Sequence, residues 1–340
     1  MDRRGVQVSL KPLVGCAAAI VVGVFGIVPE HRGALANDFP TKPLRLIVPF
    51  PPGGLNDLLA RLLGTRLAER LGAQVVIDNR PGANTIIGTE MTARATPDGY
   101  TFMIVPAGHA VNPSVYRTLP YDTIKDLRGV AFIGDSPYVL AVHPGLRVKT
   151  AAELVGLAKR KPGQISFSSS GIGNMTHLAS ELLNEIAGVK LVHVPYKGTG
   201  QLISDLMGGS VPVSIISFSS GRNYVKTGKI SLLGVTTVKR NPLLPDLPTL
   251  AESGLPGYEV SGWYGFVAPA PTPTTVINKL HAEITAVLAL PDIRDNVRKE
   301  GIDVVPMTPA AFDDRVVKEI GKWRGLVNRL GISADWGRPN

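Results

Sequence analysis

Two short loops, rich in glycine and small polar residues, hold the side chains whose types and spacing could do chemistry. The first runs from Phe50 to Asp57 and follows an apolar run. It opens an amphipathic stretch, so it stands between a predicted strand and a predicted helix. The first turn of a helix has unpaired N–H groups and the positive end of the helix dipole, which favour an anion. Gly53 and Gly54 would let an anion approach the backbone, and Asn56 suits the first turn.

The second loop runs from Ser168 to His177 and also joins a predicted strand to a predicted helix. In α/β proteins, ligands bind at the carboxyl ends of strands. The loop lacks the third glycine of a dinucleotide fingerprint and the glycine that precedes the serine in a nucleophile elbow. Neither loop contains Arg or Lys. Together they predict a carboxylate held by backbone donors, with Ser170 and Asn174 helping. Plain capped turns are the alternative interpretation of both loops.

Residues suited to catalysis are sparse. None of the six histidines pairs at metal-binding spacing, and the single cysteine is Cys16. His177 could act as a general base for Ser170, which leaves a periplasmic Ser/His hydrolase open. The favoured interpretation is that His177 lines a cleft or bonds nearby backbone. We therefore expect no enzyme, no cofactor and no metal.

The first 36 residues have the pattern of a secretory signal peptide. Arg3 and Arg4 precede the uncharged run 13–28, and Ala34-Leu35-Ala36 is a small-x-small cleavage site. The run is short for a membrane span, which needs about 20 residues. We predict cleavage near Ala36 and export to the periplasm. A retained N-terminal anchor is the alternative.

The 340-residue chain carries a formal net charge of +9, and the predicted leader accounts for little of it. A modest positive field favours anionic solutes. The basic residues are scattered rather than clustered with aromatics, so we expect no nucleic-acid partner. The length is sufficient for two domains.

Apolar runs and amphipathic stretches alternate in two successive units. In the first unit the predicted strands are 44–50, 74–78 and 100–105, and the predicted helices are 55–71 and 85–95. The second unit repeats this alternation, with strands at 165–169, 191–194, 213–218 and 230–237 and helices at 150–161, 174–187 and 200–207. Such alternation is typical of mainly parallel sheets covered by helices.

Two further apolar runs could connect the units. Residues 139–143 could cross from the first unit to the second, and 260–269 could cross back. Predicted helices at 275–290 and 309–330 then finish the chain. We predict one domain from 37–138 plus 261–340 and another from 139–260. A double connection makes a hinge, and the cleft between hinged sheets is a favoured ligand site.

Short motifs in a fixed order span nearly all of the predicted mature chain. They lie at 39–40 with 43–54 and Asp57, at 78–83, 97–101, 112–113, 119–122, 193–198, 247–252 and 262–265. This series resembles the periplasmic solute-binding proteins of tripartite tricarboxylate transporters, the Bug-type receptors. The resemblance implies a two-domain, type II periplasmic-binding-protein fold, or venus flytrap, with two mainly parallel sheets and a hinge.

The resemblance also implies which residues form the pocket around a carboxylate. One wall carries Phe50, Pro51, Pro52, Gly53 and Gly54. The facing wall carries Ser170, Gly171, Gly173, Asn174 and His177. A further pocket loop carries Tyr196, Lys197 and Gly198.

The chain departs from the family pattern in two places. Many members have Phe-Asp-Asn where this chain has Ile215, Ile216 and Ser217, and many have a glycine pair where it has Asn84 and Thr85. Ser217 stays a candidate ligand contact. The missing aspartate argues against a zwitterionic amino acid as ligand.

The leading hypothesis is therefore a monomeric receptor that captures a small organic carboxylate for the membrane subunits of a transporter. A sensory binding protein that presents its liganded form to a signalling receptor is an alternative. Arg80 and Lys197 are rival anchors that could pair directly with the carboxylate.

Overall fold

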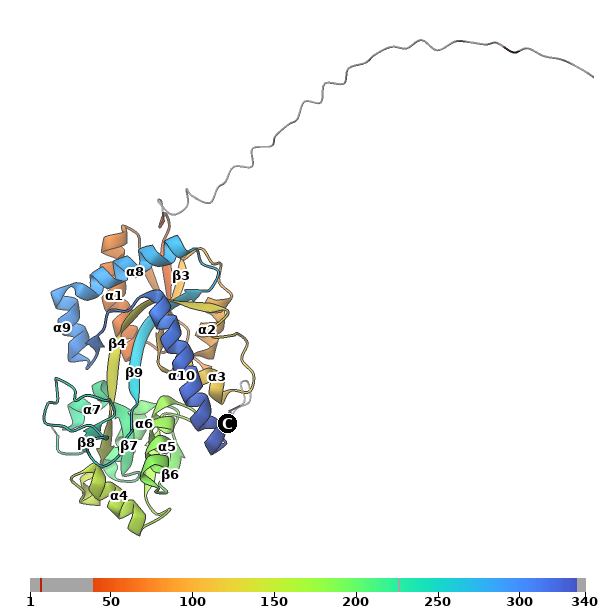
Figure 1. The fold of residues 1–340 in the computed structure, drawn as a ribbon. Helices are drawn as coiled ribbons and strands as arrows, with labels where there is room; N and C mark the ends of the chain where they lie inside the picture. Colours follow the sequence, from red (N-terminus) through yellow and green to blue (C-terminus); the bar gives the residue numbers. More distant parts are fainter. Residues whose placement is uncertain (1–6, 8–38, 226, 335–340) are drawn as a thin grey trace, which may run out of the picture. The chain divides into compact units, whose positions relative to one another are not determined.

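A computed structural model describes residues 39–225 and 227–334, together with residue 7. The predicted signal peptide and its cleavage site near Ala36 lie outside the described residues. Within those residues the chain builds two α/β lobes, each with its own arrangement of strands and helices (Figure 1).

The first lobe contains a sheet with the strand order β2-β1-β3-β9-β4, and β10 pairs with β4. Its strands are β1 (Leu44–Val48), β2 (Val75–Asn79), β3 (Thr101–Pro106), β4 (Leu127–Val142), β9 (Ser261–Pro269) and β10 (Asp303–Val304). β1 is parallel to β2 and β3, whereas β9 runs antiparallel to both β3 and β4.

The second lobe extends the sheet in the order β4-β7-β5-β6, and β8 also pairs with β4. Its own strands are β5 (Ser166–Ser169), β6 (Val192–Pro195), β7 (Val213–Ser217) and β8 (Ser231–Val235). β5 is parallel to β6 and β7, whereas β4 is antiparallel to β7 and β8.

Strand β4 belongs to both lobes. Its residues from Leu127 to Pro137 pair with β9, and those from Tyr138 to Val142 pair with β7. The architecture is the predicted α/β type, but the sheets are mixed rather than mainly parallel. The reason is that β4 and β9 cross between the lobes in opposite directions. The domain boundaries at 138 and 260 stay a prediction.

Ten α-helices cover the two lobes in the described part of the chain. Those of the first lobe are α1 (Leu55–Leu71), α2 (Ile86–Ala93), α3 (Gly108–Val115), α8 (Thr274–Ala289), α9 (Pro291–Lys299) and α10 (Pro309–Leu330). Those of the second lobe are α4 (Ala151–Arg160), α5 (Met175–Ala187), α6 (Thr199–Gly208) and α7 (Phe218–Val225). None of the helices in residues 39–225 or 227–334 has the length and apolarity to cross a membrane.

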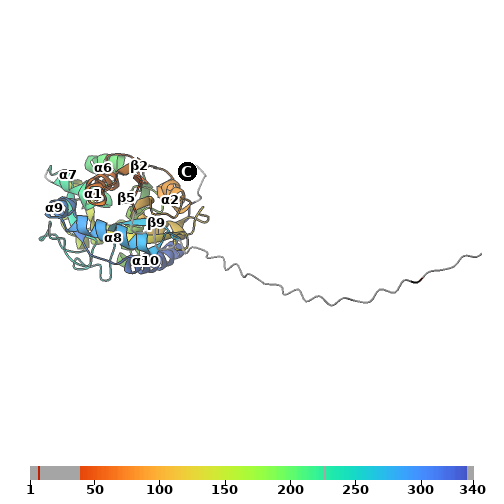
Figure 2. The same ribbon diagram turned by 90° about the horizontal axis from the view of Figure 1, so that it is seen from above.

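Alternation along the strands decides which helices cover each face. In β1, Leu46 and Val48 join the buried cluster of α1 and α8, whereas Ile47 joins the cluster that includes α3 and α10. Successive strand side chains point to opposite faces, so both faces of this buried sheet are apolar. The view from above shows α1, α2 and α8 around the strands (Figure 2).

Helices α3, α7 and α9 were not predicted. α3 has only eight residues and contains Pro113, which removes a backbone donor and weakens a helical pattern. α9 has only nine residues and begins with Pro291, so the predicted helix at 275–290 ends before it.

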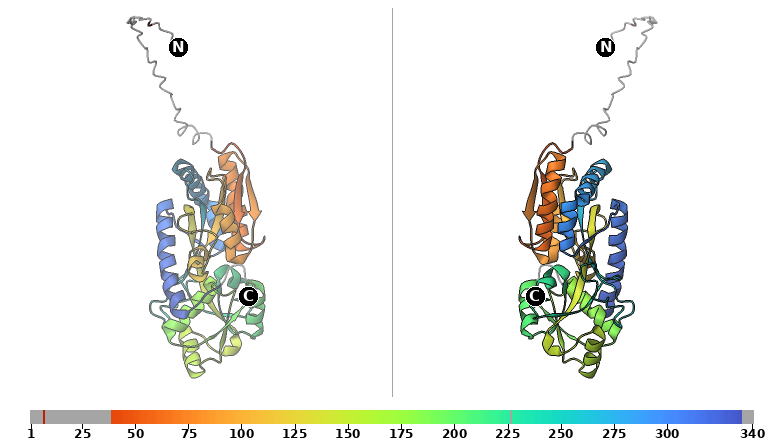
Figure 3. Two further views of the ribbon diagram at one scale, coloured as in Figure 1. Left: turned by 90° about the vertical axis from the view of Figure 1, so that its right-hand side faces the viewer. Right: turned by 90° about the vertical axis from the view of Figure 1, so that its left-hand side faces the viewer.

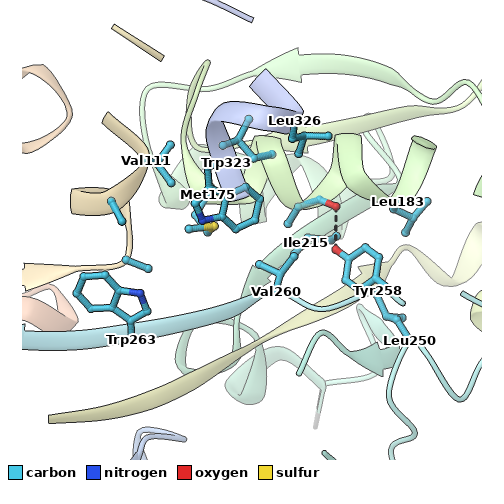
Figure 4. Close-up of a cluster of buried hydrophobic side chains, with 14 of the residues drawn as sticks. Val111, Met175, Leu183, Ile215, Leu250, Tyr258, Val260, Trp263, Trp323 and Leu326 are labelled. Atoms are coloured by element: carbon cyan, nitrogen blue, oxygen red, sulfur yellow. Dashed lines mark hydrogen bonds between the residues drawn. The ribbon is translucent and has the colours of Figure 1, made fainter. Parts of the chain in front are cut away.

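One of the hydrophobic clusters spans both lobes. α10 extends along both lobes (Figure 3) and contacts α3, β4 and α5. Its residues Trp323 and Leu326 gather with Val111 of α3 and Met175 of α5 (Figure 4). In the same cluster the Tyr258 hydroxyl donates to the Ala179 carbonyl at 2.8 Å.

Replacing Trp323 with Ala should lower the free energy of unfolding by about 3–5 kcal/mol, because the indole is 1% exposed and its loss leaves a cavity. Urea unfolding followed by circular dichroism measures this change. The neighbouring Arg324→Ala variant, at an exposed position of the same helix, is the control and should change stability by less than about 0.5 kcal/mol. Equal stabilities of the two variants would contradict a shared core at α10.

Candidate functional site

A cavity of about 970 Å³ lies between the lobes, at the carboxyl ends of the parallel strands. The first lobe contributes Pro49, Phe50, Pro51 and Asn56, then Pro81 to Thr85, Pro106, Gly108 and Tyr116. The second lobe contributes Ser170, Gly171, Ile172 and Asn174 to Thr176, then Pro195 to Thr199, Leu202, Ile216 and Ser217. The crossing strands β4 and β9 contribute Tyr138 and Tyr264.

A buried carboxylate fixes the loop between β1 and α1. The Gly53 N–H donates to Asp57 Oδ2 at 3.0 Å, and Asn79 Nδ2 donates to Asp57 Oδ1 at 2.9 Å. Asn79 Nδ2 also donates to the Phe50 carbonyl at 3.1 Å. Asp57 is 4% exposed and stands in the first turn of α1. These hydrogen bonds within the protein therefore fix the conformation of the loop between β1 and α1.

The negative charge of Asp57 is stabilised by its hydrogen-bond donors. The hydrogen bond from Arg61, opposed by burial and aided by Gly53 and Asn79, lowers the pKa of Asp57 from 3.8 to about 2. Arg61 Nε lies 3.0 Å from Asp57 Oδ2. No side chain caps α1 at Gly54, so the first N–H groups of α1 lack a side-chain acceptor.

The loop between β5 and α5 is organised by hydroxyl and amide groups. The Ser170 N–H donates to Thr176 Oγ1 at 3.0 Å, and the hydroxyls of the same two residues lie 3.1 Å apart. Asn174 caps α5 by accepting from the Thr176 N–H at 3.2 Å. Ser170 and Asn174 both line the cavity.

Two stacked histidines lie behind this loop. The rings of His177 and His193 are 3.8 Å apart at their centroids, and His177 Nδ1 accepts from the Gly173 N–H at 3.1 Å. His193 Nε2 lies 2.6 Å from Ser169 Oγ. Burial, followed by the proximity of His177, lowers the pKa of His193 to about 4. The Ser170 hydroxyl is paired with Thr176 Oγ1, whereas His177 Nδ1 is paired with the Gly173 N–H.

The loop between β6 and α6 brings Tyr196, Lys197 and Gly198 to the cavity. The Tyr196 hydroxyl donates to Asp205 Oδ2 at 2.6 Å, and burial together with Asp205 raises the pKa of Tyr196 to about 12. Lys197 is exposed and is the one formally charged residue among those that line this cavity. No side chain caps α6.

Sequence reasoning missed the two tyrosines of the crossing strands. Burial raises the pKa of Tyr138 and of Tyr264, so both hydroxyls stay protonated and can donate. A Cβ atom at Gly262 would lie 2.9 Å from the Ser136 carbonyl oxygen and 3.0 Å from the Tyr138 ring, so a glycine suits this position. The motif at 262–265 was the available signal.

Residues 59–332 match the family described as "Tripartite tricarboxylate transporter family receptor". The chain belongs to this family. As a member, it is a periplasmic solute-binding protein with an α/β fold.

Similar proteins agree with this assignment. The chain is 39% identical over 326 residues to the "UPF0065 protein in tcbD-tcbE intergenic region" of Pseudomonas sp. strain P51, covering 96% of this chain and 95% of the relative. The solved structure "R. palustris Rpa4515 with adipate" is 37% identical, with a TM-score of 0.80, and covers 87% of this chain and 99% of the other. MatC from Rhodopseudomonas palustris with bound malate is 29% identical, with a TM-score of 0.76, and covers 85% of this chain and 100% of the other.

Most of the predicted site residues of this receptor lie together at the cavity. Its walls include Phe50, Pro51, Asn56, Ser170, Gly171, Asn174, Tyr196, Lys197, Gly198 and Ser217. Pro52, Gly53 and Gly54 line an adjoining hollow of about 530 Å³, which shares Phe50, Pro51, Asn56, Thr199 and Ser217 with the cavity.

Two predicted site residues and one rival anchor lie outside the cavity walls. Gly173 has φ +71°, and a Cβ atom there would lie 2.3 Å from Val115 Cγ1 of the first lobe. His177 is 5% exposed and supports the backbone of Gly173. Arg80 pairs with Asp78 at 2.8 Å. In the described part of the receptor, no group of three or more metal-ligating side chains gathers around one point.

The Asp57→Asn variant should lose about 1–2 kcal/mol of unfolding free energy near neutral pH, because the charge that Arg61 and Gly53 stabilise is removed. The folded-state pKa is lowered, so the stabilisation is complete above pH 3.8 and is lost as pH falls toward about 2. Urea unfolding across this range measures the difference between wild type and variant. Asp246→Asn, at an exposed position, is the control. A difference that grows on acidification would contradict this assignment.

Proposed function

We propose that this receptor binds a small organic carboxylate and delivers it to the membrane subunits of a tripartite tricarboxylate-type transporter. We further infer that it acts as a monomer and releases its ligand unchanged. The family assignment and the relatives whose structures are described with adipate and malate support the ligand class.

The observation that carries the proposal is the charge distribution of the cavity. Its lining contains Lys197 and no carboxylate. The first turns of α1, α5 and α6 open toward it, and each adds partial positive charge. Lys197 and these helix starts favour an anion, and an ammonium group finds no acidic partner in this lining.

The adjoining hollow does not change this balance. Glu300 lines that hollow, but its Oε1 lies 2.8 Å from Arg222 Nη2, so its charge is already paired. At the position of the aspartate found in many relatives, Ile216 is 1% exposed and offers no charge. We therefore expect the ligand to carry carboxylate groups without an amine.

Titration calorimetry with adipate, malate, glutarate and benzoate should find at least one ligand of this receptor. Glutarate should bind at least tenfold more tightly than glutamate, about 1.4 kcal/mol, because the ammonium group of glutamate loses its hydration without gaining a partner. Adipamide serves as the neutral control for adipate. Equal affinity for glutarate and glutamate, or for adipate and adipamide, would contradict the proposed ligand class.

A second experiment separates the backbone donors of α1 from Lys197 as anchors of the carboxylate. Gly54 has an ordinary φ of −82°, and the nearest atom to a Cβ there is 3.9 Å away, so Gly54→Val adds bulk at the helix start without strain. We expect this variant to lose at least tenfold in affinity. Lys197→Ala should lose less, because an exposed charge is screened by solvent.

Gly321→Val, at an exposed position of α10 with no atom within 4 Å of the added Cβ, controls for the change of residue type. Normal binding by Gly54→Val together with lost binding by a folded Lys197→Ala would show that the lysine is the anchor.

A further inference from the structure

Three consecutive residues of the cavity wall have positive φ angles although none is a glycine. Between β2 and α2, Ala83 has φ +45°, Asn84 has φ +49° and Thr85 has φ +76°. Positive φ is disfavoured for residues with a Cβ atom, and for a β-branched residue such as Thr85 it is an outlier. Such a run persists only where the surrounding structure holds it, and it is found at functional sites.

The side chain of Asn112, on α3, makes three hydrogen bonds to this run, and the Thr89 hydroxyl donates to the Thr85 carbonyl at 2.9 Å. Asn112 is 0% exposed. Its Nδ2 donates to the Asn84 carbonyl at 2.9 Å and to Thr85 Oγ1 at 3.2 Å. Its Oδ1 accepts from Asn84 Nδ2 at 2.9 Å. One buried amide therefore uses its donors and its acceptor on two of the three strained residues.

The strained run is part of the proposed binding surface. Residues 81–85 line the cavity, opposite the loops of the second lobe. Asn112 itself is not among the lining residues, so any effect of its side chain on the cavity must act through the loop that it bonds. If the run relaxed to negative φ, the backbone of this wall would point its N–H and carbonyl groups in other directions.

We propose that Asn112 is a positioning residue for ligand binding: it holds residues 83–85 in the strained conformation that shapes the first-lobe wall. This inference rests on the proposed function of the cavity. It predicts a role for a side chain that does not touch the ligand, and it explains why Asn84 and Thr85 tolerate conformations suited to glycine.

The test compares Asn112→Ala with Thr92→Ala. Thr92 is 0% exposed and donates to the Gly88 carbonyl within α2 at 2.9 Å, so its variant removes an equally buried polar group away from the run. Calorimetry with the tightest carboxylate of the panel should show at least a tenfold loss of affinity for Asn112→Ala. Thr92→Ala should stay within twofold of wild type.

Glycine rescue separates positioning from a general structural role. Adding Asn84→Gly and Thr85→Gly to Asn112→Ala should recover most of the lost affinity, because glycine accepts positive φ without the Cβ penalty. Affinity within twofold of wild type for Asn112→Ala would overturn the proposal. So would a folded Asn112→Ala variant whose lost binding the glycines do not restore.

Hydrogen exchange of the backbone amides of residues 83–86 tests, without any ligand, whether Asn112 holds the loop. Exchange should be at least tenfold faster in Asn112→Ala and unchanged in Thr92→Ala. If wild type binds no panel ligand, the proposed function fails, whereas this comparison still decides the role of Asn112. Unchanged exchange of these amides in a folded Asn112→Ala variant would overturn the proposal.

Asn84→Ala provides a second route if Asn112→Ala does not fold. It removes the amide–amide bond but leaves the bond from Asn112 Nδ2 to the carbonyl of residue 84 possible. We expect several-fold weaker binding, and recovery with Asn84→Gly. Equal binding by the alanine and glycine variants would overturn the proposal.

Discussion

The antiparallel pairing of β4 with β9 is the constraint on which the rest of the molecule depends. This pair carries the chain between the lobes, and the parallel strands on either side end at the same cavity. Its register also decides which side chains face the cavity. A slip of either strand by one residue would turn its tyrosine, Tyr138 in β4 or Tyr264 in β9, to the opposite face, and would bring side chains against positions where only glycine fits, such as Gly265 beside Phe312.

Buried or half-buried polar side chains then fix each loop at the end of its strand. Asp57 bonds the Gly53 backbone, Asn174 caps α5, and Asn112 bonds the run 83–85. Each bond orders backbone during folding that would otherwise have to be ordered when a ligand arrives. Because ordering costs conformational entropy, a loop held in advance leaves more of the contact energy for affinity. The glycines between these fixed points keep the backbone accessible.

The long periodic elements could be predicted from the sequence, since α1, α5, α8 and α10 carry apolar residues at helical spacing and the buried strands are short apolar runs. The loops at 50–57 and 168–177 could be predicted as site candidates from their place between strand and helix. The position of Gly173 against the first lobe could not be predicted, because its neighbour Val115 is distant in sequence. The tyrosines of β4 and β9 could not be predicted as site residues, because an apolar run does not reveal which of its residues face a cavity. The strained run at 83–85 depends on a tertiary contact with Asn112 that no local pattern encodes.

Size and charge act differently in this cavity. Its volume of about 970 Å³ lies at the upper end of the range of small-molecule sites, about 300–1,000 Å³. Shape alone therefore discriminates weakly among small ligands, and waters retained beside a bound acid can bridge it to the walls. Charge discriminates more strongly, because unpaired ions lose hydration in proportion to their burial. With Lys197 exposed and Ile216 buried, the lining offers a cation and no carboxylate, which is the basis of the proposed preference for anions over ammonium groups. Selectivity among carboxylates must then come from where the fixed loops aim their donors, which makes the residues that hold those loops as important as the residues that touch the ligand.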